Sequence, residues 1–158
     1  MIAVFKERIM INLKIKFAEN SELEAIAKLS EKFEREKCCN GIVADDKDYF
    51  SDKKVAIAKV DDTVVGYCYG KFEIKEKSTS KFKKGDKSFY IEELYIDRPF
   101  RNNEIGRTLY RFMENYAKEN GCDLIETTAV SKNYKSLLSF YIDQLDMEFW
   151  SAEIIKKL

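Results

Sequence analysis

The sequence contains no histidine, and its 28 lysines and arginines are balanced by 28 aspartates and glutamates. Without histidine, a histidine-based catalytic triad or general base is excluded. The four cysteines lack the spacing of a metal site, so we predict no metal. The balanced charge produces no global field that would attract nucleic acid, and we predict no nucleic-acid partner.

Long apolar runs are also missing from the chain. The short apolar stretch within residues 1–10 is interrupted by Lys6, Glu7 and Arg8, and is too short for export or for spanning a bilayer. We therefore predict no membrane partner and, because the cysteines are expected to be free, a cytoplasmic location. The length predicts a single domain over residues 1–158, with residues 1–10 as an N-terminal extension ahead of an alternative start at Met10.

Residues 90–120 carry the most informative pattern, which predicts a strand, a turn and a helix. Aromatic and β-branched residues predict a strand over residues 90–96, and Pro99 ends it because proline cannot donate to a strand ladder. After the turn, apolar residues recur with helical spacing at Ile105, Leu109, Phe112 and Tyr116.

The turn itself, residues 101–107, has the features of an anion-binding site. The first amide N–H groups of a helix lack intrahelical partners and lie at the positive end of its dipole, where a pyrophosphate can bind. Gly106 permits close approach of a ligand, and Arg101 and Arg107 add positive charge. An ordinary strand–loop–helix connection with solvated arginines is the alternative, and the turn alone leaves both open.

This stretch resembles motif A of the GNAT superfamily of acyl-CoA-dependent N-acetyltransferases. The Arg/Gln-x-x-Gly-x-Gly/Ala signature of that motif reads Arg101-Asn102-Asn103-Glu104-Ile105-Gly106 in this sequence. The sequence departs from the signature at Glu104, where a carboxylate does not favour a diphosphate. The resemblance implies acetyl-CoA as a cosubstrate, with its pantetheine arm paired to the backbone of residues 94–96.

A second resemblance lies near the C-terminus, where superfamily members often read Asn-x-x-Ala-x-x-Phe-Tyr. Phe140-Tyr141 matches the end of that pattern, and Asn133 stands one residue further away than usual. The resemblance implies that the Tyr141 phenol protonates the departing thiolate. Alternatively, Tyr141 is a core residue, since it shares a helix face with apolar neighbours. The implied cofactor-binding residues are Leu94, Tyr95, Ile96, Arg101, Asn102, Asn103, Glu104, Ile105, Gly106, Arg107 and Asn133.

An alkylammonium acceptor must lose a proton before it can attack a thioester. With no histidine, a carboxylate on the strand at residues 90–96 is the plausible base, and side-chain alternation places Glu92 and Glu93 on opposite faces. By its position relative to Arg101, Glu92 matches the carboxylate used by several superfamily members. We therefore predict Glu92 and Tyr141 as catalytic residues, with Glu93 as the alternative base.

The remaining patterns predict the other elements. They are strands at residues 11–17 and 122–130, a helix at 21–37 with a Ser21–Glu24 capping box, a hairpin at 55–69, a lysine-rich mobile loop at 72–88, a helix at 131–142, and closing strands at 147–150 and 152–155. This order predicts a mixed α+β, three-layer, GNAT-like fold, with a mostly antiparallel sheet of about six to seven strands and helices on both faces.

The acceptor is indicated by residues 45–50, which combine three aspartates with two aromatic residues. In the superfamily this region commonly lines the acceptor pocket, and its chemistry suits a cationic amine. A solvated helix start with its aromatic residues in the core is the alternative. We predict transfer of acetyl to a primary amine of a small cationic molecule, by direct attack in a ternary complex. A protein N-terminal or lysine acetyltransferase and an acyl-CoA-binding module without turnover remain alternatives, and a homodimer is left open.

Overall fold

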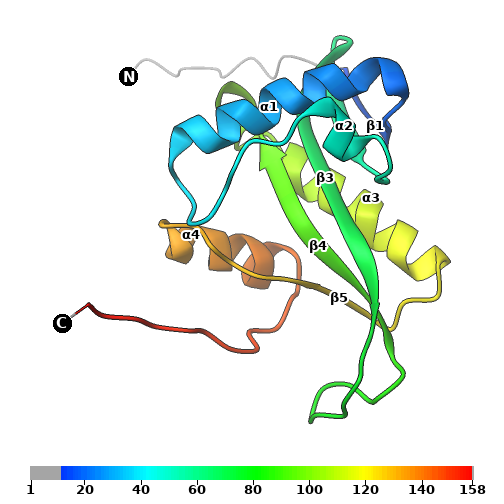
Figure 1. Cartoon of the computed structure of the whole chain (residues 1–158), viewed down its shortest axis with the longest axis vertical. Coiled ribbons are helices and arrows are strands. Elements are labelled where there is room, and N and C mark those ends of the chain that lie inside the picture. Colours follow the sequence, from blue (N-terminus) through cyan, green and yellow to red (C-terminus); the bar gives the residue numbers. More distant parts are fainter. Residues whose placement is uncertain (1–11, 158) are drawn as a thin grey trace, which may run out of the picture.

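The structure is a computed structural model that describes residues 12–157, so the expected N-terminal extension at residues 1–10 lies outside the described residues. Five strands form one sheet in chain order (Figure 1), and these are β1 (Leu13–Phe17), β2 (Ala56–Val60), β3 (Thr63–Ile74), β4 (Lys87–Ile96) and β5 (Leu124–Thr127). Neighbouring strands are antiparallel except β4 and β5, which are parallel. The mixed, mostly antiparallel sheet is confirmed, with fewer strands in the described chain than the expected six to seven.

Helices cover both faces of the sheet and make three layers (Figure 1). On one face, α1 (Leu23–Glu36) and α2 (Lys47–Phe50) enclose a core that includes Tyr67 and Tyr95. On the other face, α3 (Ile105–Glu119) packs its apolar side against a second core that includes Ile91. Short turns η1 (Asn20–Glu22) and η2 (Arg98–Phe100) precede α1 and α3, and α4 (Tyr134–Ser139) continues into a π-helical turn, η3 (Phe140–Gln144).

The capping box lies two residues earlier than expected. Glu19 N–H donates to Glu22 Oε2 at 3.0 Å, so the helical segment begins with the pair Glu19 and Glu22 rather than with Ser21 and Glu24. The η1 turn at Asn20–Glu22 is the reason, because it already includes Ser21 as a helical residue. The predicted Ser21–Glu24 box is therefore wrong.

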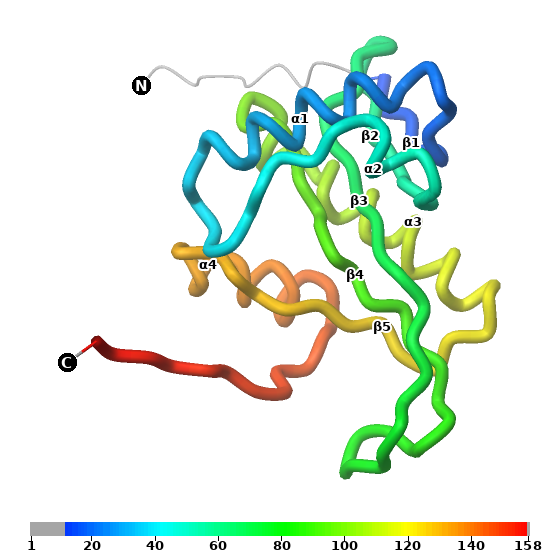
Figure 2. The backbone as a smooth tube through the Cα atoms, viewed as in Figure 1, coloured from blue at the N-terminus to red at the C-terminus, as the bar shows by residue number. Residues whose placement is uncertain are grey.

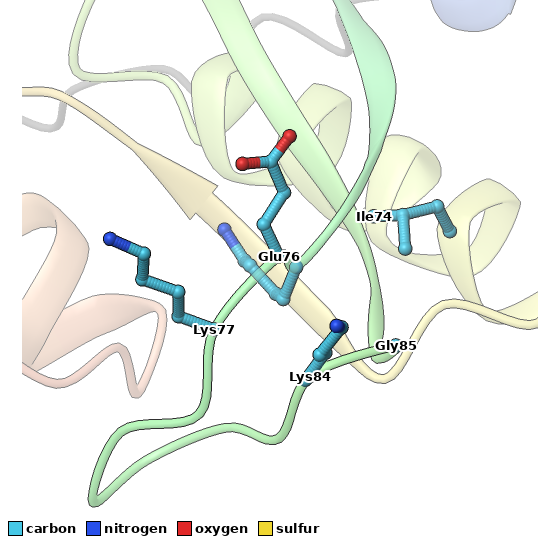
Figure 3. Close-up of a pocket in the computed structure, with 6 residues that line it drawn as sticks. Ile74, Glu76, Lys77, Lys84 and Gly85 are labelled. Carbon is cyan, nitrogen blue, oxygen red and sulfur yellow. The ribbon is translucent and has the colours of Figure 1, made fainter.

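The hairpin of β2 and β3 is confirmed, with its tight turn at Asp61 and Asp62, both at positive φ. The following lysine-rich stretch differs from the expectation. β3 runs on to Ile74 and β4 already begins at Lys87, so the connection is a shorter loop on a long projecting hairpin (Figure 1). A hollow of about 580 Å³ at the base of this loop lies at the opposite end of β4 from the turn into α3, and it is lined by Ile74, Lys75, Glu76, Lys77, Lys84 and Gly85 (Figure 3).

The closing strands expected at residues 147–150 and 152–155 are wrong for this structure. Residues 147–157 belong to no helix or strand, and Phe149 and Trp150 are about half exposed. Their aromatic and β-branched residues favour a strand, but a strand also needs a neighbouring edge with which to pair its backbone. Instead, the segment contacts the β3–β4 hairpin through an ion pair of Glu148 with Lys81 and through the Trp150 ring against Phe82.

Candidate active site

The candidate site lies where β4 and β5 separate. Their parallel pairing ends at Ile91 and Thr127, although β4 continues to Ile96. Beyond Thr127 the chain runs toward the loop after α1, where Cys39 and Ser131 form an isolated bridge (Figure 2). Residues 92–96 therefore have β3 on one side and, in the described part of the chain, no strand on the other. Such a free edge can pair with an extended ligand.

A β-bulge lies at this point of separation. Tyr69 pairs with Glu93 and Gly70 pairs with Ile91, so Glu92 is an extra residue in β4. Gly70 is required beside the bulge because an added Cβ would lie 2.2 Å from the carbonyl oxygen of Tyr90. A glycine inside a strand pattern is the sequence signal that could have revealed the bulge.

The bulge changes the facing of the two glutamates. Glu93 pairs with Tyr69 on the α1 face, and Glu92 Oε1 lies 4.0 Å from Lys71 Nζ. Lys71 follows Tyr69 by two residues and therefore shares its face. The expectation that Glu92 and Glu93 face opposite sides was wrong, because the extra residue interrupts the alternation on which it depended.

Glu93 is half-buried, and its Oε2 accepts a hydrogen bond of 2.7 Å from the Tyr67 hydroxyl. Burial raises the pKa of Glu93 to about 7; the charges of Asp45 and Glu92 act in the same direction, and the Tyr67 hydrogen bond opposes them. Burial also raises the pKa of Asp45. The three carboxylates make this side of the opening acidic, and a carboxyl group with a pKa near neutrality suits proton transfer at pH 7.

In the predicted acceptor segment, residues 45–50, some side chains lie beside the carboxylates, and others cap a helix or pack in the core. Asp45 interacts with the glutamates, and the Tyr49 hydroxyl lies 3.5 Å from that of Tyr69. In contrast, Phe50 is fully buried in the α1-side core, and Asp46 caps α2 by accepting from the N–H of Tyr49. Asp45 and Tyr49 are therefore the members of this segment placed beside the carboxylates.

The turn into α3 brings an uncapped helix N-terminus to the end of β4. Glu104 is the N-cap residue at φ 62°, and no side chain caps the helix. Thr108 N–H makes the first intrahelical bond, to Glu104 O at 2.9 Å. An added Cβ on Gly106 would make only ordinary contacts, 3.6 Å from Phe140 and 3.7 Å from Ile96. Packing therefore does not require glycine here, which favours the ligand-binding interpretation of the turn.

The two arginines of the turn bind protein groups. Arg107 pairs with Glu104 at 2.7 Å, so the carboxylate that departs from the signature has a cationic partner. Arg101 donates to Ile96 O and to Glu36. An anion at this turn would therefore be bound mainly by backbone N–H groups rather than by these side chains.

Two of the three asparagines of the predicted set, Asn103 and Asn133, make hydrogen bonds within the protein. The Asn103 amide donates to the carbonyl oxygens of Phe100 and Arg101. Asn133 is the N-cap of α4, where its N–H donates to Ser131 Oγ. Within residues 12–157, no hydrogen bond joins Asn133 to the turn at residues 101–107.

Tyr141 lies in η3 and packs its ring 6.4 Å from that of Tyr110 in α3. Burial raises the pKa of Tyr141, against the opposing effect of a hydrogen bond with Thr127. Thr127 is the last residue of β5, so the Tyr141 hydroxyl stands where the two strands part. The raised pKa keeps the phenol protonated at neutral pH but also makes it a weaker acid, and the same residue contributes to packing.

Residues 12–157 contain neither a membrane-spanning helix nor a cluster of metal ligands. None of the helices among residues 12–157 is both long and apolar enough to cross a bilayer. No group of three histidine, cysteine, aspartate or glutamate side chains in the same range is arranged to hold a metal ion.

The sheet thus opens between two parallel strands, with a helix N-terminus beside the opening. The sequence pattern of the acetyltransferase (GNAT) family matches residues 20–145. The chain therefore belongs to the acetyltransferase (GNAT) family, and it is an acetyltransferase. Comparison with curated protein sequences gave no match.

Solved acetyltransferase structures share this fold. The aminoglycoside N-acetyltransferase AAC(6')-Iy, in complex with CoA, has a TM-score of 0.69 at 15% identity, covering 94% of this chain and 95% of its own. An aminoglycoside acetyltransferase from an uncultured soil metagenomic sample, in complex with sisomicin, gives 0.67 at 19% identity, with coverage of 92% and 96%. Glucosamine-6-phosphate N-acetyltransferase from Arabidopsis thaliana gives 0.63 at 16% identity, with coverage of 92% and 97%.

Proposed function

We propose that this chain, as a single domain, moves the acetyl group of acetyl-CoA to a primary amine of a small cationic acceptor, by direct attack in a ternary complex. The observation that carries the proposal is the opening between β4 and β5. It joins an uncapped helix N-terminus on one side to the carboxylates of Asp45, Glu92 and Glu93 on the other.

Acetyl-CoA is an extended ligand that carries a diphosphate, and we propose that it binds along this opening. The amides of its pantetheine arm would pair with the free backbone of Leu94, Tyr95 and Ile96. The diphosphate would accept hydrogen bonds from backbone N–H groups of Asn103 to Arg107 at the start of α3. Gly106 allows that approach without a side chain in the way.

The proton of the acceptor ammonium goes to a carboxylate, and we propose Glu92 for this role. Glu92 is the bulged residue at the point where the strands part. The free amine then attacks the thioester carbonyl, a C–N bond forms, the C–S bond breaks, and the thiolate takes a proton from Tyr141. The attacking nitrogen releases its second proton to give the neutral amide, and that proton restores the Tyr141 phenol. Glu93 is the alternative base, favoured by its burial and its pKa of about 7.

A cationic acceptor is supported by the same carboxylates. The charge of Glu92 raises the pKa of both Asp45 and Glu93, the charge of Asp45 also raises that of Glu93, and an ammonium group would relieve this repulsion. Tyr49 is partly exposed beside them, and the Lys53 ammonium lies 4.2 Å from the centre of its ring, so the ring can bind a cation. The related folds include aminoglycoside acetyltransferases, whose acceptors carry several amines.

The test is CoA release from acetyl-CoA with a panel of amines, together with mass detection of the acetylated product. The panel contains polyamines, aminoglycosides, amino-acid amides and lysine-containing peptides. We expect turnover with small polycationic amines. Acetylation of peptides alone would establish the protein acetyltransferase instead, and binding of acetyl-CoA without turnover on any amine would establish the binding module.

A further inference from the structure

Glu36, the last residue of α1, has a buried carboxylate that the proposed chemistry does not use. Its side chain is 12% exposed. Glu36 Oε1 accepts hydrogen bonds from the Tyr95 hydroxyl at 2.7 Å and from Arg101 Nη2 at 2.8 Å. Its Oε2 is buried without a hydrogen-bond partner, and Arg98 Nη2 lies 3.8 Å away. The carboxylate thus stands between two guanidinium groups.

Arg101, the first residue of the turn into α3, is fixed by this carboxylate. Its Nε donates to Ile96 O at 2.8 Å, and its guanidinium lies 5.3 Å from the centre of the Tyr95 ring. A guanidinium offers several donors in a rigid planar fork, so it can bond a carboxylate and a carbonyl at once. Arg101 therefore ties the start of the turn to α1 and to the end of β4.

The turn needs such an anchor because its backbone is strained. Asn102 and Glu104 both have left-handed backbone, at φ 63° and 62°. Residues other than glycine adopt this conformation at a cost of about 1–2 kcal/mol, and they keep it only where surrounding contacts enforce it. No side chain caps α3, so its first N–H groups are oriented by the path of the turn.

We propose that Glu36 is a positioning residue for the diphosphate of acetyl-CoA. Through Arg101 it holds the turn at residues 101–107 in the conformation that aims its backbone N–H groups at the diphosphate. Loss of the carboxylate would leave the guanidinium groups of Arg98 and Arg101 close together without an anion between them, and their repulsion would release the turn. This inference rests on the proposed use of acetyl-CoA.

A donor without a diphosphate separates positioning from general structural support. S-acetylpantetheine keeps the thioester and the pantetheine arm that pairs with β4, but it makes no contact with the turn. A role of Glu36 in positioning the turn therefore affects acetyl-CoA and leaves S-acetylpantetheine unaffected. A role in holding the whole fold would affect both donors equally.

The experiment measures kcat and KM of the Glu36→Gln variant with both donors. We expect kcat/KM for acetyl-CoA to fall about tenfold or more, through KM, since a charged hydrogen-bonded pair is lost. We expect kcat/KM for S-acetylpantetheine to change by less than about twofold. Equal losses on both donors, or no loss on acetyl-CoA, would overturn the inference.

Two further variants make the result specific. Glu31→Gln removes a carboxylate of the same helix that is 51% exposed and pairs with Arg35, and it should change neither donor. Arg101→Lys keeps the charge but loses the planar guanidinium, so it should lower kcat/KM for acetyl-CoA and not for S-acetylpantetheine, as Glu36→Gln does. The double variant should lower kcat/KM for acetyl-CoA no more than either single variant. If the melting curve of Glu36→Gln shows that this variant does not fold, the two donors are compared with Arg101→Lys in its place.

Binding measurements distinguish a failure of this inference from a failure of the proposed function. Calorimetry with CoA and with pantetheine uses no acceptor and no turnover. Absence of CoA binding to the unaltered protein would remove the proposed function and this inference together. Equal binding of CoA by the unaltered protein and by Glu36→Gln would remove the inference and leave the proposed function in place.

Discussion

The Tyr67 hydroxyl donates a hydrogen bond of 2.7 Å to Glu93 Oε2, joining β3 to β4 on the face covered by α1. The bond orients a carboxyl group whose pKa burial raises to about 7. Close to neutral pH, Glu93 therefore exists in both protonation states. Whether this residue or its neighbour Glu92 takes the proton of the acceptor can be decided by a matched pair of variants.

Glu92→Gln should lower the turnover rate about a hundredfold at a pH well below the pKa of the acceptor amine, because the proton acceptor is lost while the shape is kept. The loss should shrink as pH rises toward that pKa, since more of the amine arrives unprotonated. Steady-state rates across pH measure this. Glu93→Gln is the control. If Glu93→Gln loses activity and Glu92→Gln keeps it, the base is Glu93.

The unfolding free energy should report the raised pKa of Glu93 independently of catalysis. Between about pH 4.5 and pH 7 the folded state binds more protons at Glu93 than the unfolded state does, so rising pH lowers the free energy of unfolding over that range. From pH 4 to pH 8, the protein should lose on the order of 1–3 kcal/mol relative to Glu93→Gln, with the full contribution present at pH 4. Denaturant unfolding at both pH values measures it, and a constant difference would contradict the raised pKa.

Gly106→Ala should separate folding from ligand binding. A Cβ at this position makes only ordinary contacts, and alanine is the better helix former, so the variant without ligand should be as stable or up to about 1 kcal/mol more stable. Acetyl-CoA at about a hundred times its dissociation constant should stabilise the unaltered protein by roughly 2.7 kcal/mol. Most of that gain should vanish in the variant, and more so in Gly106→Val. An unchanged melting shift would remove the diphosphate site.

Glu104→Gly tests the departure from the family signature. Glycine adopts φ 62° without the clash that glutamate experiences, so the unfolding free energy should rise by about 0.5–1 kcal/mol. Acetyl-CoA binding should tighten or stay unchanged, because a carboxylate near the diphosphate is removed. Thermal melting and calorimetry measure the two effects. A large loss of binding would show that the Glu104–Arg107 pair supports the turn.

Tyr141→Phe should slow turnover about a hundredfold with little change in acetyl-CoA affinity, because only the hydroxyl is lost. In contrast to Glu92→Gln, the loss should not fade as pH rises toward the pKa of the amine. Steady-state rates measure the change in turnover, and equilibrium binding of acetyl-CoA measures the change in affinity. Normal turnover combined with a lowered melting temperature would make Tyr141 a packing residue beside Tyr110.

Local patterns in the sequence were enough to predict the elements around the site. The strand predicted at residues 90–96 is the second half of β4, and the helix predicted from Ile105 is α3, which begins at that residue. The β2–β3 hairpin was equally clear. Helical and strand periodicities, and a two-residue turn, depend on residues close in the chain, so the sequence contains them directly.

The C-terminal segment shows the opposite case. Residues 147–155 have the composition of strands, yet they pair with no strand, and residues 148–155 are exposed. A strand is completed only by hydrogen bonds to a neighbour, and composition does not identify that neighbour. The prediction of six to seven strands failed at the same place, where it depended on partners far away in the chain.

The details of the site were decided by tertiary contacts. The bulge at Glu92 arises because the pairing register of β3 and β4 shifts beside Gly70. The shift interrupts the alternation of side chains from which the two glutamates were predicted to lie on opposite faces. Arg101 donates a hydrogen bond to Glu36, 65 residues away, a partner that its sequence position did not indicate. The sequence by itself determined the strand, the turn and the helix at residues 90–119, because these follow from local patterns. The burial, charge partners and direction of each side chain depend on packed neighbours from distant segments, and only the folded chain brings those together.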